Sequence, residues 1–207
     1  VPLIGFAGAP FTLASYAIEG GHSNTFAHTK ALMYGHPDAW HRLCEKFASV
    51  VGDYLNAQID AGVDAVQVFD SWVGALNPAD YREFVLPHTR RIFETVGRRV
   101  PTIHFGTGTA TLLEDLRDAG GDVIGVDWRI PLDTAWDRIG ADHAVLGRLE
   151  VIARIIIERR AIIVQFRANP GAVVDHQVDA VRRRDRGADQ VAHRDAFRPL
   201  LLRPCDR

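Results

Sequence analysis

The chain has 207 residues, of which 47% are hydrophobic and 24% charged, with a formal net charge of −2. This length fits one domain with a sizeable core, and the near-neutral charge gives no indication of a nucleic-acid partner. No apolar run approaches the roughly 20 residues of a membrane span, so we expect no membrane partner. The first residues, VPLIGFAG, lack the basic-then-apolar order of a secretion signal. They begin inside an expected strand without an initiator Met, which indicates that the front of a longer protein is missing.

The two cysteines, Cys44 and Cys205, are far apart in the sequence and have no metal-binding spacing. Cys44 falls in an amphipathic segment, so we expect a buried, reduced thiol rather than a reactive one. Together with the absence of a secretion signal, this cysteine usage predicts a cytoplasmic protein.

Five short segments of the first three quarters of the chain predict β-strands: residues 1–8, 63–70, 100–106, 122–128 and 143–149. The first is continuously apolar, as is typical of a strand buried on both faces of a parallel sheet. A helix or loop follows each strand, and this alternation predicts a parallel α/β fold.

After the first strand, a glycine-rich turn leads into a helix that we expect to expose Phe11, Thr12 and Tyr16 just past the strand's carboxyl end. A second helix follows, with Ser23 or Asn24 as its cap. A third, long helix has Pro37 in its first turn and ends at Gly62. Its apolar residues recur every three or four positions and predict a core-facing stripe of Trp40, Leu43, Phe47, Val50, Val51 and Tyr54.

Further along, Asn77 and Pro78 open a helix that Pro87 is expected to kink and that runs to Gly97. Residues 106–121 predict a turn and a helix, and residues 131–140 a short helix. Side chains suited to chemistry stand at the strands' carboxyl ends, where barrel folds place their ligands. A full (β/α)8 barrel typically needs about 250 residues. Five of eight strands therefore predict an incomplete barrel over residues 1–149.

Residues 150–207 break this pattern. Residues 151–207 hold 12 Arg against 7 Asp and Glu, and residues 151–166 fit a strand or a helix equally well. A basic tail that binds an acidic partner, a solvated or disordered end, and a foreign reading frame would each explain this composition. We favour the foreign reading frame or a damaged gene end, because the segment contains no strand–turn–helix unit.

Four segments of the chain resemble the uroporphyrinogen decarboxylase family in its bacterial form. They are GFAGAPFTLASYAIEG (5–20), VQVFDSWVGALNPADYREFVLP (66–87), IHFGTGT (103–109) and GVDWRIPLD (125–133). The resemblance covers roughly residues 1–149 and implies a (β/α)8 barrel, usually a homodimer, that needs no cofactor and no metal. Such an enzyme removes CO2 from the four acetate side chains of uroporphyrinogen III, giving coproporphyrinogen III in haem biosynthesis.

The resemblance also implies roles for particular residues. Tyr16 and Ser71 match catalytic positions, where the phenol bonds near the reacting acetate and the hydroxyl contacts a carboxylate. The residues expected to bind substrate are Phe6, Ala7, Pro10, Phe69, His104 and Asp127. Taken without the family, five of these residues have a structural alternative. Tyr16, Phe69 and His104 can be packed core residues, Ser71 a helix cap, and Asp127 the cap of the segment that follows it.

Several parts of the family's pattern have no counterpart in this sequence. They are the first signature with its arginines, the aspartate of the second strand and the last strand. By this alignment strands three to seven remain, so we expect the chain by itself to be inactive and poorly soluble.

Two alternatives stay open. Corrinoid-dependent methyltransferases have a similar fold but carry a zinc-binding His-x-Cys where this chain has His104, Phe105 and Gly106. The second alternative is a non-catalytic truncated domain that pairs with a partner chain.

Overall fold

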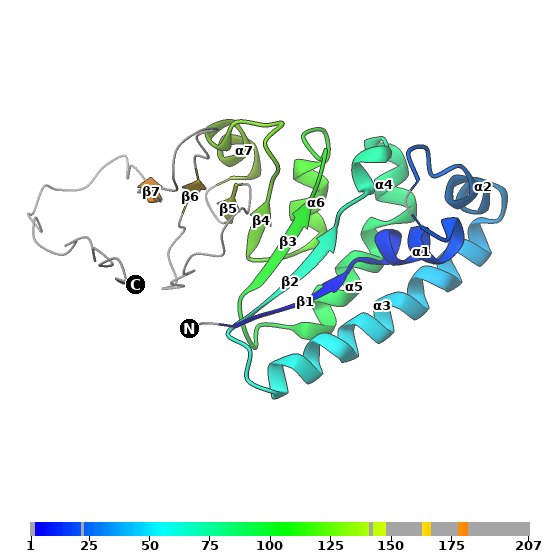
Figure 1. The fold of residues 1–207 in the computed structure, drawn as a ribbon, viewed down its shortest axis with the longest axis horizontal. Coiled ribbons are helices and arrows are strands. Elements are labelled where there is room, and N and C mark those ends of the chain that lie inside the picture. The colour runs from blue at the N-terminus through cyan, green and yellow to red at the C-terminus, as the bar shows by residue number, and fades with distance from the viewer. Residues whose placement is uncertain (1–2, 22, 141–142, 148–162, 167–177, 182–207) are drawn as a thin grey trace, which may run out of the picture.

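The structure is a computed structural model that describes residues 3–21, 23–140, 143–147, 163–166 and 178–181. The strands of this part of the chain form one sheet, in which spatial order follows chain order (Figure 1). All neighbouring strands are parallel except the last pair. The strands are β1 (Ile4–Gly8), β2 (Ala65–Asp70), β3 (Thr102–Gly106), β4 (Val123–Gly125), β5 (Ala144–Leu146), β6 (Ile163–Phe166) and β7 (Val178–Val181). The first five confirm the strands that the sequence predicts.

The helices also fall within the predicted segments. They are α1 (Pro10–Glu19), α2 (Ala27–Gly35), α3 (Pro37–Asp60), α4 (Pro78–Phe84), α5 (Leu86–Val96), α6 (Leu113–Ala119) and α7 (Leu132–Ile139), with a 3-10 turn at Val73–Ala75. The residue at the start of α2, however, is Phe26, not the predicted cap Ser23 or Asn24, and no side chain caps this helix.

Asn77 caps α4 as predicted, since its Oδ1 accepts a bond of 3.0 Å from the Asp80 N–H. Pro87 does not kink a continuous helix. The chain breaks at Val85, and Pro87 lies in the first turn of α5, where its missing N–H is not needed.

Successive helices form one layer against the sheet. Helix α3 packs on α5, α5 on α6, and α6 on α7, while α3 also contacts β1 and α7 contacts β5 (Figure 1). A doubly wound sheet has helices on both faces and a reversal of strand order. Sequential parallel strands backed by one helical layer are instead the arrangement of part of a (β/α)8 wall, as the sequence predicts.

Because side chains alternate along a strand, each strand presents one set to the helices and the other to the opposite face. Ala7, Val66 and Val68 belong to a buried cluster with Val51 and Leu55 of α3. On the opposite face, which we call the open face, Phe6 is 61% exposed. The open face is therefore where a large ligand could reach the sheet.

The buried stripe of α3 differs from the predicted one. The residues facing the core are Trp40, Cys44, Ala48, Val51 and Leu55. Val50 and Tyr54 are 64% and 57% exposed, because each lies about 100° around the helix from the neighbouring buried residue. Cys44 is buried as expected, and burial raises the pKa of its thiol.

Helix α1 also differs from expectation on its inner side. Phe11 and Thr12 are buried, and only Tyr16 of the three predicted residues is exposed, at 53%. The Phe11 ring packs between Phe26 and Trp40, with centroid distances of 6.0 and 5.9 Å. The first turn of α1 therefore serves the core, and its second turn reaches solvent.

Beyond residue 150 the structure describes two strands. β6 pairs in parallel with β5 through Val164 and Leu146, and β7 runs antiparallel to β6. The sequence left a strand and a helix equally open for residues 151–166. The described part of this range, Ile163–Phe166, is a strand. The rest of residues 150–207, with the hypotheses of disorder and of a foreign reading frame, lies outside the described residues. Within the described part of the chain, no helix is both long and apolar enough to cross a membrane.

Candidate functional site

Three phenylalanines, one from each of the first three strands, form a row on the open face. Phe6 meets Phe69 with ring centroids 5.9 Å apart, and Phe69 meets Phe105 at 5.8 Å, both nearly edge to face. The strand register causes this contact, because Phe69 pairs with Phe105, and Phe6 pairs with Gln67, which lies on the same face of β2 as Phe69. The row spans two strand intervals, about 10 Å. It offers an apolar wall to a flat or ring-shaped ligand.

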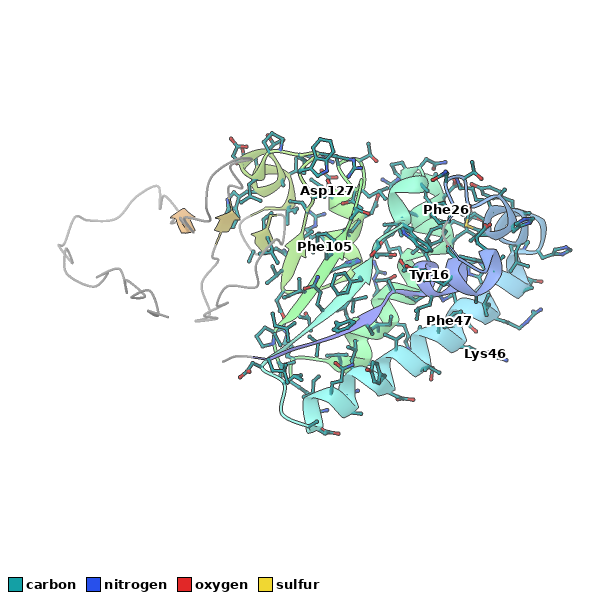
Figure 2. All side chains as sticks on the ribbon, viewed as in Figure 1. Tyr16, Phe26, Lys46, Phe47, Phe105 and Asp127 are labelled. Carbon is teal, nitrogen blue, oxygen red and sulfur yellow. The ribbon has the colours of Figure 1, made fainter. Side chains whose placement is uncertain are left out.

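Tyr16 and Ser71 lie beside this row, at the carboxyl ends of β1 and β2. The Tyr16 ring lies 4.1 Å, centroid to centroid, from the ring of Trp72, which directly follows Ser71. The Ala9 N–H donates to the Phe69 carbonyl at 2.9 Å and holds the exit of β1 against the end of β2. These contacts bring Tyr16 of α1 to the corner of the sheet where β2 ends with Phe69 and Asp70 and is followed by Ser71. Figure 2 labels Tyr16 there.

Asp127 stands at the end of β4, two strands from β2 (Figure 2). Its buried carboxylate accepts from the Gly108 N–H at 2.7 Å and from the Arg129 N–H at 3.1 Å, and it pairs with the Arg129 guanidinium. These bonds join the loop after β3 to the loop after β4. They are the contacts expected if Asp127 caps its own loop. The Arg129 side chain is half exposed, and its Cζ lies 4.9 Å from the centre of the Trp128 ring. It places a positive charge beside Asp127 at this end of the sheet.

The structure does not bring His104 to the open face. Its fully buried ring points toward the helices, with Nδ1 3.1 Å from the Leu116 carbonyl oxygen and 3.2 Å from that of Gly120. Its Nε2 lies 3.6 Å from the Asp70 carboxylate. Burial raises the pKa of that carboxyl, and its contact with His104 opposes the rise. This environment matches a packed histidine.

Phe105 is the residue that the sequence analysis missed at this strand. It follows His104 and therefore faces the opposite way, into the row. The alternation of side chains along a strand could have identified it, because residues 103 and 105 face the side opposite to His104. Ala7 and Pro10, also expected to bind substrate, are not exposed on the open face: the Ala7 side chain packs toward the helices, and Pro10 is buried at the start of α1.

Across the described ranges, no three His, Cys, Asp or Glu side chains gather as they would around a metal ion. The position that carries His-x-Cys in the methyltransferases holds His104, Phe105 and Gly106 here, and His104 is turned toward the helices.

The chain is similar to known proteins over most of its described part. The family model "Uroporphyrinogen decarboxylase (URO-D)" matches residues 1–167. The uroporphyrinogen decarboxylase of Streptomyces coelicolor is 59% identical over 150 residues, covering 72% of this chain and 42% of that protein. That of Chloroflexus aurantiacus is 57% identical over 155 residues, covering 72% and 44%.

Among solved structures, a methyltransferase from Methanosarcina mazei matches with a TM-score of 0.63 and 20% identity, over 71% of this chain and 42% of that one. This likeness shows a shared fold. The chain spans less than half the length of the curated relatives named above. Because the family model matches well over half of its residues, the chain belongs to the uroporphyrinogen decarboxylase family.

Proposed function

We propose that the open face is part of the substrate site of a uroporphyrinogen decarboxylase, which converts uroporphyrinogen III to coproporphyrinogen III. The observation that carries this proposal is the aromatic row Phe6–Phe69–Phe105 with Tyr16 and Ser71 at its edge. A porphyrinogen combines an apolar macrocycle with charged side chains around its rim. An apolar wall bordered by hydroxyl groups and a guanidinium matches that distribution.

The chemistry explains what the residues must do. When the bond between the acetate CH2 and its carboxylate breaks, CO2 leaves and the electron pair must enter the pyrrole ring. A ring protonated beforehand accepts the pair as a cationic iminium, the CH2 carbon then takes up a proton to become a methyl group, and the ring releases its first proton to restore the neutral pyrrole. No external electron acceptor is needed, so the reaction proceeds without a cofactor.

In this proposal each group has a distinct task. The phenylalanine rings pack against the macrocycle and exclude water, which strengthens polar contacts at their border. The Tyr16 phenol donates to the carboxylate of the reacting acetate, and the Ser71 hydroxyl to a neighbouring carboxylate. Phe6, Phe69, Tyr16 and Ser71 remain assigned to the site. His104 is left out because it faces the helices.

Assembly as a homodimer rests on the family alone. A location in the cytoplasm rests also on the cysteine usage, and the absence of a cofactor also on the chemistry given above. The division at residue 149 into a barrel part and an Arg-rich tail also stays a proposal. The family match continues to residue 167.

Binding of uroporphyrin III, the oxidised and fluorescent form of the substrate, to the 207-residue chain tests the proposal. We expect saturable binding that Tyr16→Phe weakens about tenfold to a hundredfold, as for one hydrogen bond to a charged group. Tyr54→Phe is the matched control, since Tyr54 is similarly exposed but lies on α3. A wild-type chain that does not bind uroporphyrin III, or equal effects of the two substitutions, would refute the proposal.

Turnover is measured separately, by adding uroporphyrinogen III anaerobically and following coproporphyrinogen III by chromatography after oxidation. We expect no product from this chain alone. Product formation would refute that expectation and strengthen the proposed function.

A further inference from the structure

The ring that contacts Tyr16 comes from outside its own helix. Tyr16 is 53% exposed on the second turn of α1. An exposed aromatic side chain on a helix can occupy more than one rotamer. The ring that meets it belongs to Trp72, on the loop after β2, at 4.1 Å and an interplanar angle of 45°.

Trp72 is in turn seated against a buried ring. The ring centroid of Phe26 lies 5.2 Å from that of Trp72 and 6.0 Å from that of Phe11. The Phe11 centroid lies 5.9 Å from that of Trp40. Tyr16 is half exposed, whereas Phe26, Phe11 and Trp40 are buried. Together with Trp72, these residues form a series of contacting rings, in the order Tyr16, Trp72, Phe26, Phe11 and Trp40. It connects the edge of the site to the core.

Phe26 adopts a backbone conformation that is costly for a residue with a side chain. Its φ of 54° and ψ of 40° are left-handed, and among the described residues it is the one non-glycine with positive φ. Strained residues persist only where their surroundings enforce them, and they concentrate at functional sites. The left-handed turn directs the Phe26 ring between Phe11 and Trp72 instead of into solvent.

Hydrogen bonds hold the surrounding segments in place. The Phe26 N–H donates to Ser23 Oγ at 2.9 Å. Lys30 donates its N–H to the Phe26 carbonyl and its Nζ to the Ala75 carbonyl, both at 2.8 Å. Glu19 Oε1 accepts from the N–H and the hydroxyl of Thr29, at 2.9 Å each. These bonds join α1, the start of α2 and the loop that carries Trp72.

We propose that Trp72, seated by the left-handed Phe26, is a positioning residue that aims the Tyr16 phenol at the substrate carboxylate. The inference rests on the proposed function for its ligand, a polycarboxylated tetrapyrrole. Trp72 acts through Tyr16, so its contribution disappears when the phenol is absent. Phe26 acts one step further back, through Trp72.

A measurement without ligand tests whether Trp72 fixes the position of the Tyr16 ring. The chain has four tyrosines, so fluorotyrosine incorporated in their place gives few 19F signals, which single Tyr→Phe variants assign. We expect the Tyr16 signal to be displaced by the Trp72 ring current, and to move toward the position of free fluorotyrosine in Trp72→Leu and in Phe26→Gly. Glycine adopts the left-handed conformation without strain, so Phe26→Gly removes the ring and keeps the turn. An unmoved Tyr16 signal in folded Trp72→Leu would overturn the inference.

Binding of uroporphyrin III to the full chain tests the role in recognition. We expect Trp72→Leu to weaken binding about as much as Tyr16→Phe, and Trp72→Phe, which keeps an aromatic plane, to restore most of the affinity. The double variant Tyr16→Phe/Trp72→Leu should bind no more weakly than Tyr16→Phe alone.

The control is Trp128→Leu, an exposed tryptophan at the end of β4, whose effect should add fully to that of Tyr16→Phe. If Trp72→Leu weakens binding by the same factor with and without the phenol, the positioning role is wrong and the proposed function stands. If the wild-type chain shows the displaced 19F signal but binds no uroporphyrin III, the proposed function fails and the recognition role fails with it.

Discussion

Gly5 allows a side-chain amide to bond to the backbone of β1, and replacing it should expel that amide. Gln58 of α3 accepts from the Phe6 N–H at 2.8 Å through Oε1 and donates to the Phe6 carbonyl at 3.1 Å through Nε2. In the described sheet, β1 is an edge strand with β2 as its neighbour. A Cβ on Gly5 would lie 2.3 Å from Gln58 Oε1, closer than contact distance.

The size of the effect follows from these contacts. Two neutral hydrogen bonds contribute about 0.5–1.5 kcal/mol each, so losing both costs about 1–3 kcal/mol. The smaller conformational freedom of alanine in the unfolded chain returns about 0.4–1 kcal/mol. We therefore expect Gly5→Ala to lower the free energy of unfolding by about 1.3 kcal/mol, the difference between the midpoints of the two ranges. Urea denaturation of the full chain, followed by far-UV circular dichroism, measures this loss.

A double-mutant cycle separates this mechanism from a general intolerance of alanine. Gln58→Ala should cost about 1–3 kcal/mol, and adding Gly5→Ala should cost little more, because the amide is already gone. Gly35→Ala is the matched control: nothing lies within 4 Å of its Cβ, so stability should stay the same or rise. Additive losses in the cycle, or a Gly5→Ala chain as stable as wild type, would refute the reasoning.

Three further changes test other parts of the structure. His88 Nε2 lies 2.9 Å from His41 Nδ1, and burial beside this second imidazole lowers the pKa of His88. The unfolded chain then takes up the proton first as the pH falls. Stability should decline below about pH 6.5, by at most about 1.4 kcal/mol per pH unit for this one group. In His88→Gln the decline between pH 7 and pH 5 should be smaller, and an equal decline would contradict the assignment. Phe11→Ala should lower the free energy of unfolding by about 3–5 kcal/mol, as for other buried aromatic residues, and a loss below about 1 kcal/mol in urea denaturation would show that the ring is not packed as described. Asp127→Ala should cost about 2 kcal/mol through its lost bonds to Gly108 and Arg129, and Asp127→Asn less, because an amide oxygen still accepts from Gly108. Unchanged stability with weakened uroporphyrin III binding would instead place Asp127 on the substrate.

The strands could be predicted because their signals are local. Each is a short apolar run bounded by glycine or proline, and such runs indicate strands without knowledge of their neighbours. The buried face of α3 could not be predicted equally well. Trp40 is buried and Tyr54 exposed, although both fit a spacing of three and four, because two adjacent lines of apolar residues share that spacing. Which line faces the core depends on the position of α5 and β1.

The candidate site shows the same division between local and long-range information. Sequence motifs located the carboxyl ends of the strands, but they did not distinguish between His104 and Phe105. The two residues are adjacent and therefore face opposite sides of the sheet. The pairing of Phe69 with Phe105 decides which one faces the site, and that pairing is a property of the assembled sheet. Trp72 and Phe26 escaped notice for a similar reason, because their roles arise from contacts between loops more than 40 positions apart. A ligand on the open face would therefore meet the phenylalanine row that we propose as part of the site, whereas Asp70 and His104 lie buried on the side of the sheet that faces the helices.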